Sequence, residues 1–326
     1  MSISVYILSG FLGSGKTTVL KRIVEESKNR GNKLGIILNE LGDTNVENHL
    51  FENEQMVELL NGCICCSIQD DLKATLQQFV ENPVDVLVIE GTGVANPTEI
   101  VEALATPAYI DTFSIQSIIS LVDASHYLEY QSIFSSSKEI RTLLKDQITS
   151  ASLILLNKAD LVSDRKLDKI TAQIRKQVPQ GISILPTSYG QIDGDELLMQ
   201  RLRTVDLLNE EKQSTCGCST DDTCTHNHVN HGTINAVKLV DLPKFERKTF
   251  EKWLRSLPED VFRGKGIVQF KEDSNTYSFQ FASRKLFLEE VTAGSKMQNP
   301  IIILIGHAID QEAVKKSYET TFLQKV

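Results

Sequence analysis

The sequence predicts an α/β fold: a doubly wound, mostly parallel sheet followed by a smaller α+β domain. Short apolar segments alternate with amphipathic helical segments along most of the chain, the pattern of a sheet covered by helices on both faces. Polar residues follow several of these segments directly, at the strand ends where such sheets place functional groups. We therefore expect a first domain at residues 1–208, a linker at 209–232 and an α+β domain at 233–326.

The strands of the first domain are expected where apolar residues run together between turn-forming residues. They are predicted at residues 2–9, 34–38, 56–60, 84–89, 118–122, 153–156 and 182–186. Helices are expected where apolar residues recur every three or four positions. This pattern begins with Val19, Leu20, Ile23 and Val24, returns across residues 68–80, and predicts a closing helix at residues 196–203.

Periodicity stops between residues 209 and 232, where the chain is polar and carries Cys, His, Asp and Thr. This segment is therefore predicted to be a linker or long loop. Regular patterns resume after it. Strands are expected at residues 233–240, 267–270, 277–281, 286–291 and 300–305, and helices at 248–257 and 310–318.

The composition narrows the possible partners and compartments. The chain has 326 residues, of which 41% are hydrophobic, enough for two globular domains. Its net charge of −9 argues against duplex nucleic acid as the main partner. No run approaches the roughly 18 apolar residues of a membrane span, and the N-terminus has no basic stretch or cleavage site. We expect a cytoplasmic protein without a membrane partner.

The strongest motif is GFLGSGKT at residues 10–17, between a predicted strand and a predicted helix. In that setting the pattern predicts a phosphate-binding loop, because glycines let backbone N–H groups face phosphate oxygens. Lys16 is expected to reach the β- and γ-phosphates and Thr17 to hold Mg²⁺. A glycine-rich turn without a ligand is the alternative. The predicted nucleotide contacts are Gly13, Ser14, Gly15, Lys16, Thr17 and Thr18.

A second motif, Glu-Gly-Thr-Gly at residues 90–93, follows the predicted strand at 84–89. An acid there can hold the Mg²⁺ shell or the attacking water, and Gly93 can meet the γ-phosphate. Glu90 is therefore a catalytic candidate, together with Lys16 and Glu40. A strand-end turn is the alternative interpretation. Because no obvious glutamine follows this motif, we expect slow turnover, well below the ~10 s⁻¹ median of enzymes.

Asn-Lys-Ala-Asp at residues 157–160 follows the predicted strand at 153–156 and resembles the guanine-specificity motif of GTPases. Asp160 would accept two hydrogen bonds, from the guanine N1–H and from the exocyclic amine. Adenine lacks that pair of donors and would leave the acid unpaired. Asn157, Lys158 and Asp160 are thus predicted to bind GTP or GDP. A helix N-cap formed by Asp160 is the alternative.

All six cysteines fall in two clusters, and thiols concentrated in this way indicate metal or redox chemistry. Three thiols of the first cluster can supply two or three ligands to one soft or borderline metal ion. Reversible disulfide formation and buried structural cysteines are the alternatives. The candidate ligands are Cys63, Cys65 and Cys66, with a fourth ligand from His126 or from a carboxylate such as Glu40 or Asp43.

The second cluster lies in the predicted linker. Its irregular spacing argues against a zinc finger, and we interpret the segment as a loose arm that collects metal. A solvated linker with incidental cysteine and histidine residues is the alternative. The candidate ligands are Cys216, Cys218, Cys224, His226, His228 and His231.

Together these motifs resemble those of the CobW-type GTPases, a metallochaperone family in the same larger group as the urease and hydrogenase nickel-insertion GTPases. The resemblance covers nearly the whole chain. It implies a zinc- or cobalt-handling GTPase whose internal metal site is the first cysteine cluster. Leu38 stands where some members carry a metal-binding acid, and Asp43 stands where many have Glu. The matching segments are residues 10–18, 39–42, 62–66, 90–93, 122–126 and 157–160.

The motifs and the resemblance lead to one functional expectation, a GTP-hydrolysing metallochaperone that uses GTP, Mg²⁺ and Zn²⁺, or Co²⁺ in place of zinc. GTP would order residues 39–43 and 90–93 and draw the intervening thiols together, and hydrolysis would release the metal to a client metalloprotein. The C-terminal domain would provide the docking surface for that client. The alternatives are a nucleotide-gated zinc buffer or sensor without a client, and a redox-regulated GTPase.

Overall fold

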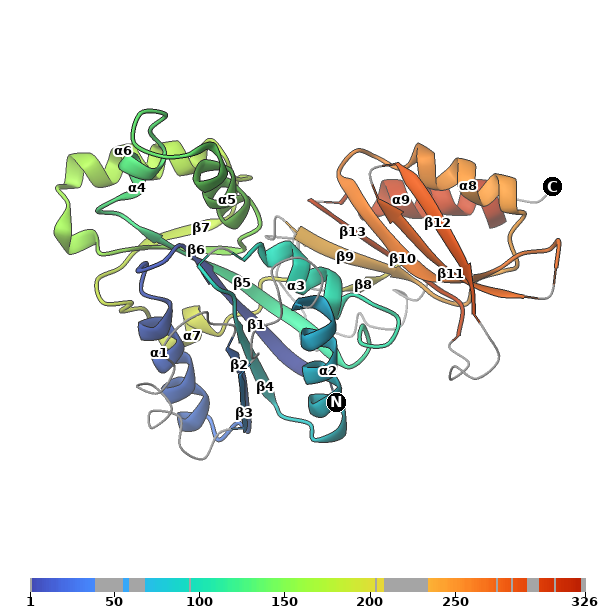
Figure 1. The fold of residues 1–326 in the computed structure, drawn as a ribbon, viewed down its shortest axis with the longest axis horizontal. Coiled ribbons are helices and arrows are strands. Elements are labelled where there is room, and N and C mark those ends of the chain that lie inside the picture. The colour runs from blue at the N-terminus through green and yellow to red at the C-terminus, as the bar shows by residue number, and fades with distance from the viewer. Residues whose placement is uncertain are drawn as a thin grey trace, which may run out of the picture. The chain divides into compact units, whose positions relative to one another are not determined.

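The chain forms two compact units (Figure 1). The first runs to Leu202, apart from the short stretch Ala105–Ala108, and the second contains most of the residues that follow. The computed structural model describes residues 2–38, 55–58, 68–93, 95–202, 204–207, 234–273, 275–282, 284–291, 299–307 and 309–323.

The first unit is built on a seven-stranded sheet in the order β3-β2-β4-β1-β5-β6-β7. Every pairing in it is parallel, which confirms the predicted doubly wound parallel sheet. β5 is longer than predicted because its first half, which includes polar residues, pairs with the start of β1. The strands are β1 (Ile3–Gly10), β2 (Leu34–Leu38), β3 (Gln55–Glu58), β4 (Val86–Glu90), β5 (Phe113–Asp123), β6 (Leu153–Asn157) and β7 (Ser183–Pro186).

Helices cover both faces of this sheet (Figure 1). In β6, Leu155 packs in one core cluster with Val19 of α1, whereas Leu156 packs in another with Ile170 of α6. Successive side chains of a strand point to opposite faces, so these clusters lie on opposite sides of the sheet. The helices are α1 (Lys16–Asn29), α2 (Ile68–Glu81), α3 (Pro97–Leu104), α4 (Tyr127–Tyr130), α5 (Lys138–Thr149), α6 (Asp164–Arg175) and α7 (Gly194–Leu197).

The predicted closing helix at residues 196–203 is wrong, because α7 ends at Leu197. Beyond it, the backbone N–H groups of Arg201 and Leu202 both donate to the carbonyl of Gln116 in β5, at 2.7 and 2.9 Å. A continuing α-helix would direct those N–H groups to carbonyls four residues earlier. The hydrogen bonds to β5 therefore replace the helical ones and end the helix early.

The second unit contains a six-stranded sheet in the order β12-β11-β10-β13-β9-β8. Its pairings are antiparallel except that of β8 with β9, and the predicted α+β architecture is confirmed. β8 precedes the predicted linker at 209–232 and yet pairs within this sheet. The elements are β8 (Val205–Asp206), β9 (Ile234–Leu239), α8 (Arg247–Ser256), β10 (Val261–Gln269), β11 (Thr276–Ala282), β12 (Lys285–Glu290), β13 (Ile301–His307), α9 (Gln311–Tyr318) and a π-helical turn (Glu319–Leu323).

Aromatic side chains form much of the core of the second unit. Trp253 of α8 meets Tyr318 and Phe322 edge to face, with ring centroids 5.8 and 5.4 Å apart. Phe250 meets Phe279 of β11 in the same way, at 5.3 Å. Such pairs contribute about 0.5–1.5 kcal/mol each beyond the area that they bury. These contacts therefore hold α8, α9 and the sheet together.

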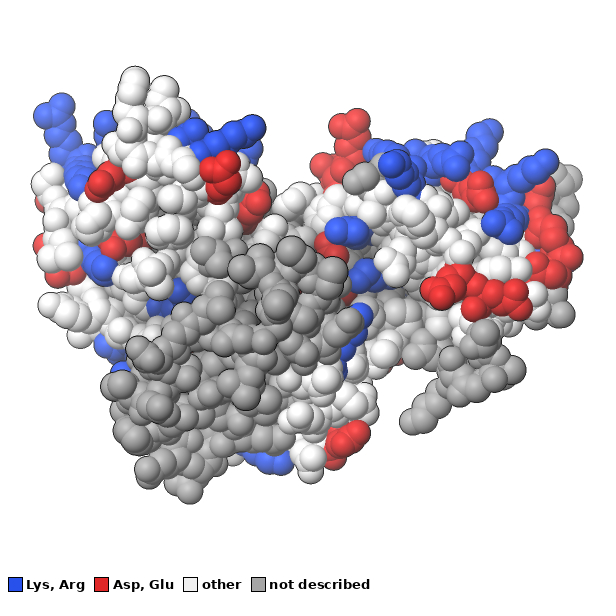
Figure 2. Space-filling view, viewed as in Figure 1, with Lys and Arg blue, Asp and Glu red and all other residues white. Residues whose placement is uncertain are grey.

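The described surface carries mixed charge. On the face shown in Figure 2, Lys and Arg gather in small patches with Asp and Glu between them, and neither sign forms a continuous field. Within the described ranges, no helix has the length and apolar character needed to cross a bilayer.

Candidate functional site

The carboxyl ends of β2, β3 and β4 lie level with one another, and the neighbouring β1 runs two residues further at the same edge. The backbone register pairs Leu8 of β1 with Glu90 of β4, Glu90 with Leu38 of β2, and Leu38 with Glu58 of β3. The chain therefore leaves all four strands at the same edge. This is the edge at which open parallel sheets bind ligands.

The loop between β1 and α1, residues 11–15, makes a bend that depends on its glycines. Gly15 has a φ of 102°, in the left-handed region, and a Cβ there would lie 2.4 Å from Nδ2 of Asn157. Gly13 also has a positive φ, 75°. The Ser14 N–H donates to the Phe11 carbonyl at 3.1 Å and closes the turn. Any side chain at Gly15 would both strain the backbone and collide with Asn157.

The start of α1 gathers hydrogen-bond donors. The N–H groups of a first helical turn have no intrahelical partner, and the helix dipole adds partial positive charge there. Lys16 is only 7% exposed, and its Nζ donates to the Gly10 carbonyl at 3.1 Å. Thr17 is half-buried and Thr18 is exposed. The Ser14 hydroxyl is buried and has no hydrogen-bond partner among the described residues. The arrangement suits an anionic ligand.

The second motif lies against this loop. Glu90 is the last residue of β4 and is 3% exposed. Gly93 lies so close to the backbone of Leu12 that a Cβ on Gly93 would be 2.8 Å from the Leu12 nitrogen. Gln147 of α5 holds the segment from the other side, donating through Nε2 to the carbonyls of Gly93 and Ala95, both at 3.3 Å. The two predicted phosphate-side motifs are therefore neighbours in the structure.

Asn157, the last residue of β6, joins three segments of the chain. Its Nδ2 donates to the Ser14 carbonyl at 2.9 Å. Its Oδ1 accepts hydrogen bonds from the Gly190 N–H at 3.0 Å and from the Thr187 hydroxyl at 3.2 Å. The residue is 2% exposed. Asn157 therefore braces the loop after β1 against the turn after β7, a positioning role that its sequence motif did not reveal.

Lys158 and Asp160 follow in a tight turn. Lys158 has a left-handed backbone, with φ 59°, and its Nζ donates to Oδ2 of Asp123 at 2.7 Å. Asp160 lies in the short 3-10 helix Ala159–Leu161 and is exposed. No hydrogen bond or ion pair joins its carboxylate to any residue that the structure describes. The N-cap of α6 is Ser163, so the alternative interpretation of Asp160 as a helix cap is wrong.

His126, one of the predicted candidates for the fourth metal ligand, immediately precedes α4. Its Nδ1 lies 2.7 Å from the Ser125 hydroxyl and 3.4 Å from Oδ2 of Asp123. Its ring stacks on Tyr130, which in turn contacts Phe11 of the loop after β1, with centroids 5.9 and 5.0 Å apart. Within the described part of the chain, His126 joins no group of three metal-ligating side chains.

Several predicted site residues lie outside the part of the chain that the structure describes. They are the carboxylates Glu40 and Asp43, the first thiol cluster Cys63, Cys65 and Cys66, and the linker residues Cys216, Cys218, Cys224, His226, His228 and His231. The predicted linker at 209–232 lies outside it as well.

Sequence reasoning missed Asp123. It is the last residue of β5, 8% exposed, and is paired in register with Asn157. Burial alone would raise the pKa of this carboxyl group, but hydrogen bonds from Lys158 and Ser125 outweigh burial and lower the pKa below its ordinary value. The signal in the sequence was an acid directly after an apolar strand. Its partner Lys158 is 35 residues away, which no local pattern shows.

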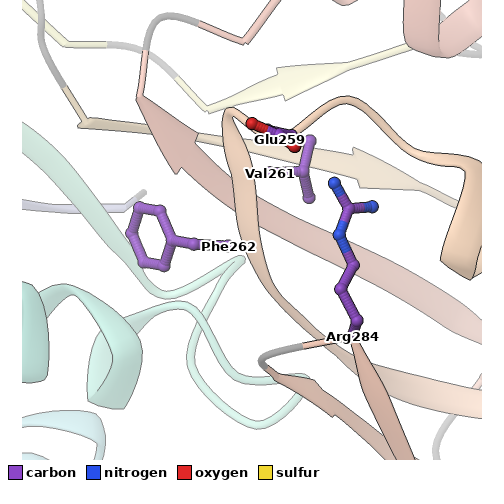
Figure 3. A pocket seen from close by; sticks show the side chains of 4 residues that line it. All are labelled: Glu259, Val261, Phe262 and Arg284. Carbon is purple, nitrogen blue, oxygen red and sulfur yellow. The ribbon is translucent and has the colours of Figure 1, made fainter.

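A separate pocket of about 260 Å³ lies in the second unit and is lined by Glu259, Val261, Phe262 and Arg284 (Figure 3). Arg284 points toward Val261 there, whereas the Phe262 ring points the other way. The Arg284 guanidinium already donates to the Leu257 carbonyl at the end of α8, at 2.6 Å. This side chain therefore has a structural role.

Comparison with known protein families shows which family the chain belongs to. The CobW/HypB/UreG nucleotide-binding domain matches residues 4–185. The chain belongs to the CobW/HypB/UreG family. The cobalamin synthesis protein cobW C-terminal domain matches residues 234–321 in addition. The two matches confirm the predicted CobW-type P-loop GTPase, with the nucleotide-binding domain placed on the unit that carries the strand-end site.

Relatives of this CobW/HypB/UreG protein align along nearly its full length. It is 28% identical to the zinc chaperone YjiA of Escherichia coli K12, over 97% of this chain and 98% of the relative. It is 25% identical to the zinc chaperone CobW of Pseudomonas aeruginosa, over 97% of this chain and 90% of the relative. It is 29% identical to zinc-regulated GTPase metalloprotein activator 1 of Schizosaccharomyces pombe, over 93% of this chain and 82% of the relative.

Proposed function

We propose that this protein is a GTP-hydrolysing metallochaperone that binds zinc through Cys63, Cys65 and Cys66 and delivers it to a client protein in a nucleotide-dependent way. The strand register carries the proposal. β3 ends level with β2 and β4, at the edge where β1 leads into the glycine-rich loop, so the chain leaves β3 for the thiol-bearing residues 59–67 at that edge. The names of the relatives, zinc chaperone and zinc-regulated GTPase metalloprotein activator, support the same proposal.

The triphosphate of GTP is assigned to the loop after β1 and to the first turn of α1. The Ser14 hydroxyl, buried and without a partner among the described residues, and the N–H groups of this turn fit an anionic group. Lys16 would exchange its bond to the Gly10 carbonyl for one to the phosphates. Thr17 would hold the Mg²⁺ ion that neutralises phosphate charge. The proposed phosphate contacts are Gly13, Ser14, Gly15, Lys16, Thr17, Thr18 and Gly93.

The guanine base is assigned to the turn after β6. Asp160 is exposed and, among the described residues, unpaired, so its carboxylate can accept hydrogen bonds from the guanine N1–H and exocyclic amine. Asn157 holds this turn against the phosphate-binding loop, which links the two parts of the nucleotide site. Glu90, buried at the end of β4, is the described candidate for the hydrolytic step, and Glu40 remains the second.

The proposed coupling between GTP and zinc is energetically feasible. Shifting a two-state segment from 1:99 to 99:1 requires about 5.5 kcal/mol of differential binding. Charge-assisted hydrogen bonds contribute roughly 1.5–3 kcal/mol each, so about two to four contacts to the γ-phosphate suffice. Gly93 lies against the phosphate-binding loop, so a ligand in that loop would act directly on the segment after β4.

The test is the Zn²⁺ affinity of the purified, reduced protein, measured once with a non-hydrolysable GTP analogue and once with GDP. We expect affinities that differ at least tenfold between the two states. Equal tight binding would favour a zinc buffer or sensor, and the absence of tight binding in both states would contradict the proposed metal role and favour redox regulation.

Two cysteine variants separate the two clusters. Cys65→Ala should abolish tight zinc binding while GTP affinity stays unchanged, because the thiol is a proposed metal ligand only. Cys224→Ala, in the linker cluster, is the matched control and should keep the nucleotide-dependent difference. Loss of both metal and GTP binding in Cys65→Ala would show that the first cluster is structural. Recovery of a metalloprotein on immobilised protein only with the GTP analogue would support client delivery.

A further inference from the structure

Asp123 stands at the centre of a small polar network at the ends of β5 and β6. Its Oδ2 accepts a hydrogen bond from Nζ of Lys158 at 2.7 Å. Its Oδ1 accepts two hydrogen bonds from Ser125, one from the backbone N–H at 2.9 Å and one from the hydroxyl. Ser125 is held in turn, because its carbonyl accepts a hydrogen bond from Lys166 of α6 at 2.9 Å. Both oxygens of the carboxylate therefore have fixed donors.

Lys158 has a second carboxylate close to it in the sequence, that of Asp160. Lys158 and Asp160 are two residues apart in one turn, and an ammonium group is a natural partner for a carboxylate. If the Lys158 ammonium paired with Asp160, the carboxylate predicted to bind guanine would already be engaged. The structure shows the other arrangement. Lys158 pairs with Asp123, and the Asp160 carboxylate has no partner within the described residues.

We propose that Asp123 is a positioning residue for guanine specificity, because it holds the Lys158 ammonium away from Asp160 and leaves that carboxylate available to the base. The inference rests on the proposed binding of guanine nucleotides. Asp123 is 8% exposed, whereas the Lys158 side chain is 33% exposed, so the pair is partly shielded from water and is fixed on the carboxylate side. Asp123 acts through Lys158 and does not itself touch the nucleotide.

The effect is visible in the ratio of two affinities. Inosine diphosphate lacks only the exocyclic amine of GDP, so the ratio of the two affinities reports the hydrogen bond from that amine to Asp160. In the native protein we expect GDP to bind at least tenfold more tightly than inosine diphosphate, because an unpaired acceptor is costly. In Asp123→Asn, Lys158 is released toward Asp160, and the ratio should fall to about one third of its native value or less.

A double variant distinguishes this effect from simple bracing of the loop. Lys158→Met removes the ammonium, so it should keep the native GDP-to-inosine-diphosphate ratio even if both affinities fall. Adding Lys158→Met to Asp123→Asn should then restore the ratio that Asp123→Asn lost. Asp195→Asn removes the carboxylate of another ion pair of the same unit, Arg30–Asp195, and is the matched control with an unchanged ratio.

Two outcomes would overturn the inference. Asp123→Asn could keep the native ratio, whether or not both affinities fall, or the double variant could fail to restore the ratio. If Asp123→Asn does not fold, the native ratio in Lys158→Met still tests the inference, because a lowered ratio there would contradict it. Failure of the unmodified protein to bind GDP would contradict the proposed function, which keeps the two failures distinguishable.

Discussion

The loop that follows β1 and the segments that follow β5 and β6 form two sides of one site, and they are held in place by different means. On the first side, called here the phosphate side (residues 10–18), the backbone itself fixes the shape through positive φ angles at Gly13 and Gly15. On the second, called the base side (residues 123–126 and 157–160), hydrogen bonds between side chains fix the shape: Asp123 with Lys158, and Asn157 with Thr187.

This difference explains how each side should respond to substitution. On the phosphate side almost any added side chain is harmful, because the constraint is on backbone conformation and space. On the base side the size of a side chain matters less than its hydrogen-bonding groups, because the constraint is a set of named donors and acceptors. Asn157 belongs to both, since it bonds to the Ser14 carbonyl and also excludes a Cβ from Gly15.

Gly15→Ala should have the largest effect. Its Cβ would lie 2.4 Å from Nδ2 of Asn157, and the φ of 102° would be strained in any other residue. We expect a loss of about 3 kcal/mol in nucleotide binding, or roughly 100-fold in affinity, from left-handed strain together with the displaced Asn157. Titration with GDP measures it.

Gly31→Ala is the matched control for that substitution. Gly31 has a φ of 71° at the end of α1, and a Cβ there would meet nothing within 4 Å. We expect a loss of about 1 kcal/mol in the free energy of unfolding from backbone strain alone, with GDP affinity unchanged. Similar GDP affinities in the two alanine variants would contradict the steric explanation for Gly15.

Asn157→Ala should have the next largest effect and should act on both sides at once. It leaves the Ser14 carbonyl and the Gly190 N–H buried without their partner. We expect the free energy of unfolding to fall by about 2–3 kcal/mol, and GDP affinity to fall in parallel. Urea unfolding and GDP titration check the two effects, and a change below about 0.5 kcal/mol in both would show that Asn157 is not the brace described above.

Thr187→Val sharpens the same comparison with a smaller change. Valine keeps the shape of threonine but removes the hydroxyl that donates to Oδ1 of Asn157 at 3.2 Å, while the Gly190 N–H remains. We expect a loss of about 1 kcal/mol in the free energy of unfolding, the usual value of one neutral hydrogen bond. A loss as large as that of Asn157→Ala would mean that packing, not hydrogen bonding, holds the base side.

The pH dependence of Asp123 should be the smallest effect at neutral pH. Its pKa is lowered in the folded protein, so its stabilisation is present above the ordinary aspartate pKa and is lost as pH falls through the lower, folded value. The difference in unfolding free energy between the native protein and Asp123→Asn should stay constant from about pH 8 to 5 and shrink below about pH 4. A difference that shrinks near pH 6 would contradict an ionised, hydrogen-bonded carboxylate.

The sequence predicted the strands of the first sheet well where they are runs of apolar residues bounded by turn-forming ones. In the second sheet it missed β8 and placed the start of β10 six residues late, at residue 267 and not at Val261. It predicted the end of α7 poorly, because the carbonyl of Gln116 in β5 captures the N–H groups of Arg201 and Leu202. Those two hydrogen bonds join residues far apart in the chain. The helical periodicity around residues 196–203 gives no sign of these contacts with β5.

The candidate site shows the same contrast between local and long-range constraints. The glycine-rich loop could be predicted because its constraint is local and its glycines stand at fixed spacing in the sequence. The contact made by Asp123 could not be predicted, since it depends on Lys158 and on the register of β5 with β6. Local motifs therefore predicted the candidate residues of both sides, but not the side-chain contacts that hold the base side in place.

The most direct measurement is a comparison of GDP and ADP affinities for the unmodified protein by calorimetry at one salt concentration. The Asp160 carboxylate is exposed and, within the described residues, unpaired, so we expect it to bind the guanine base. GDP should then bind at least about 1,000-fold more tightly than ADP. Equal affinities for the two nucleotides would contradict the assignment of the base side and, with it, the proposed GTP-dependent function.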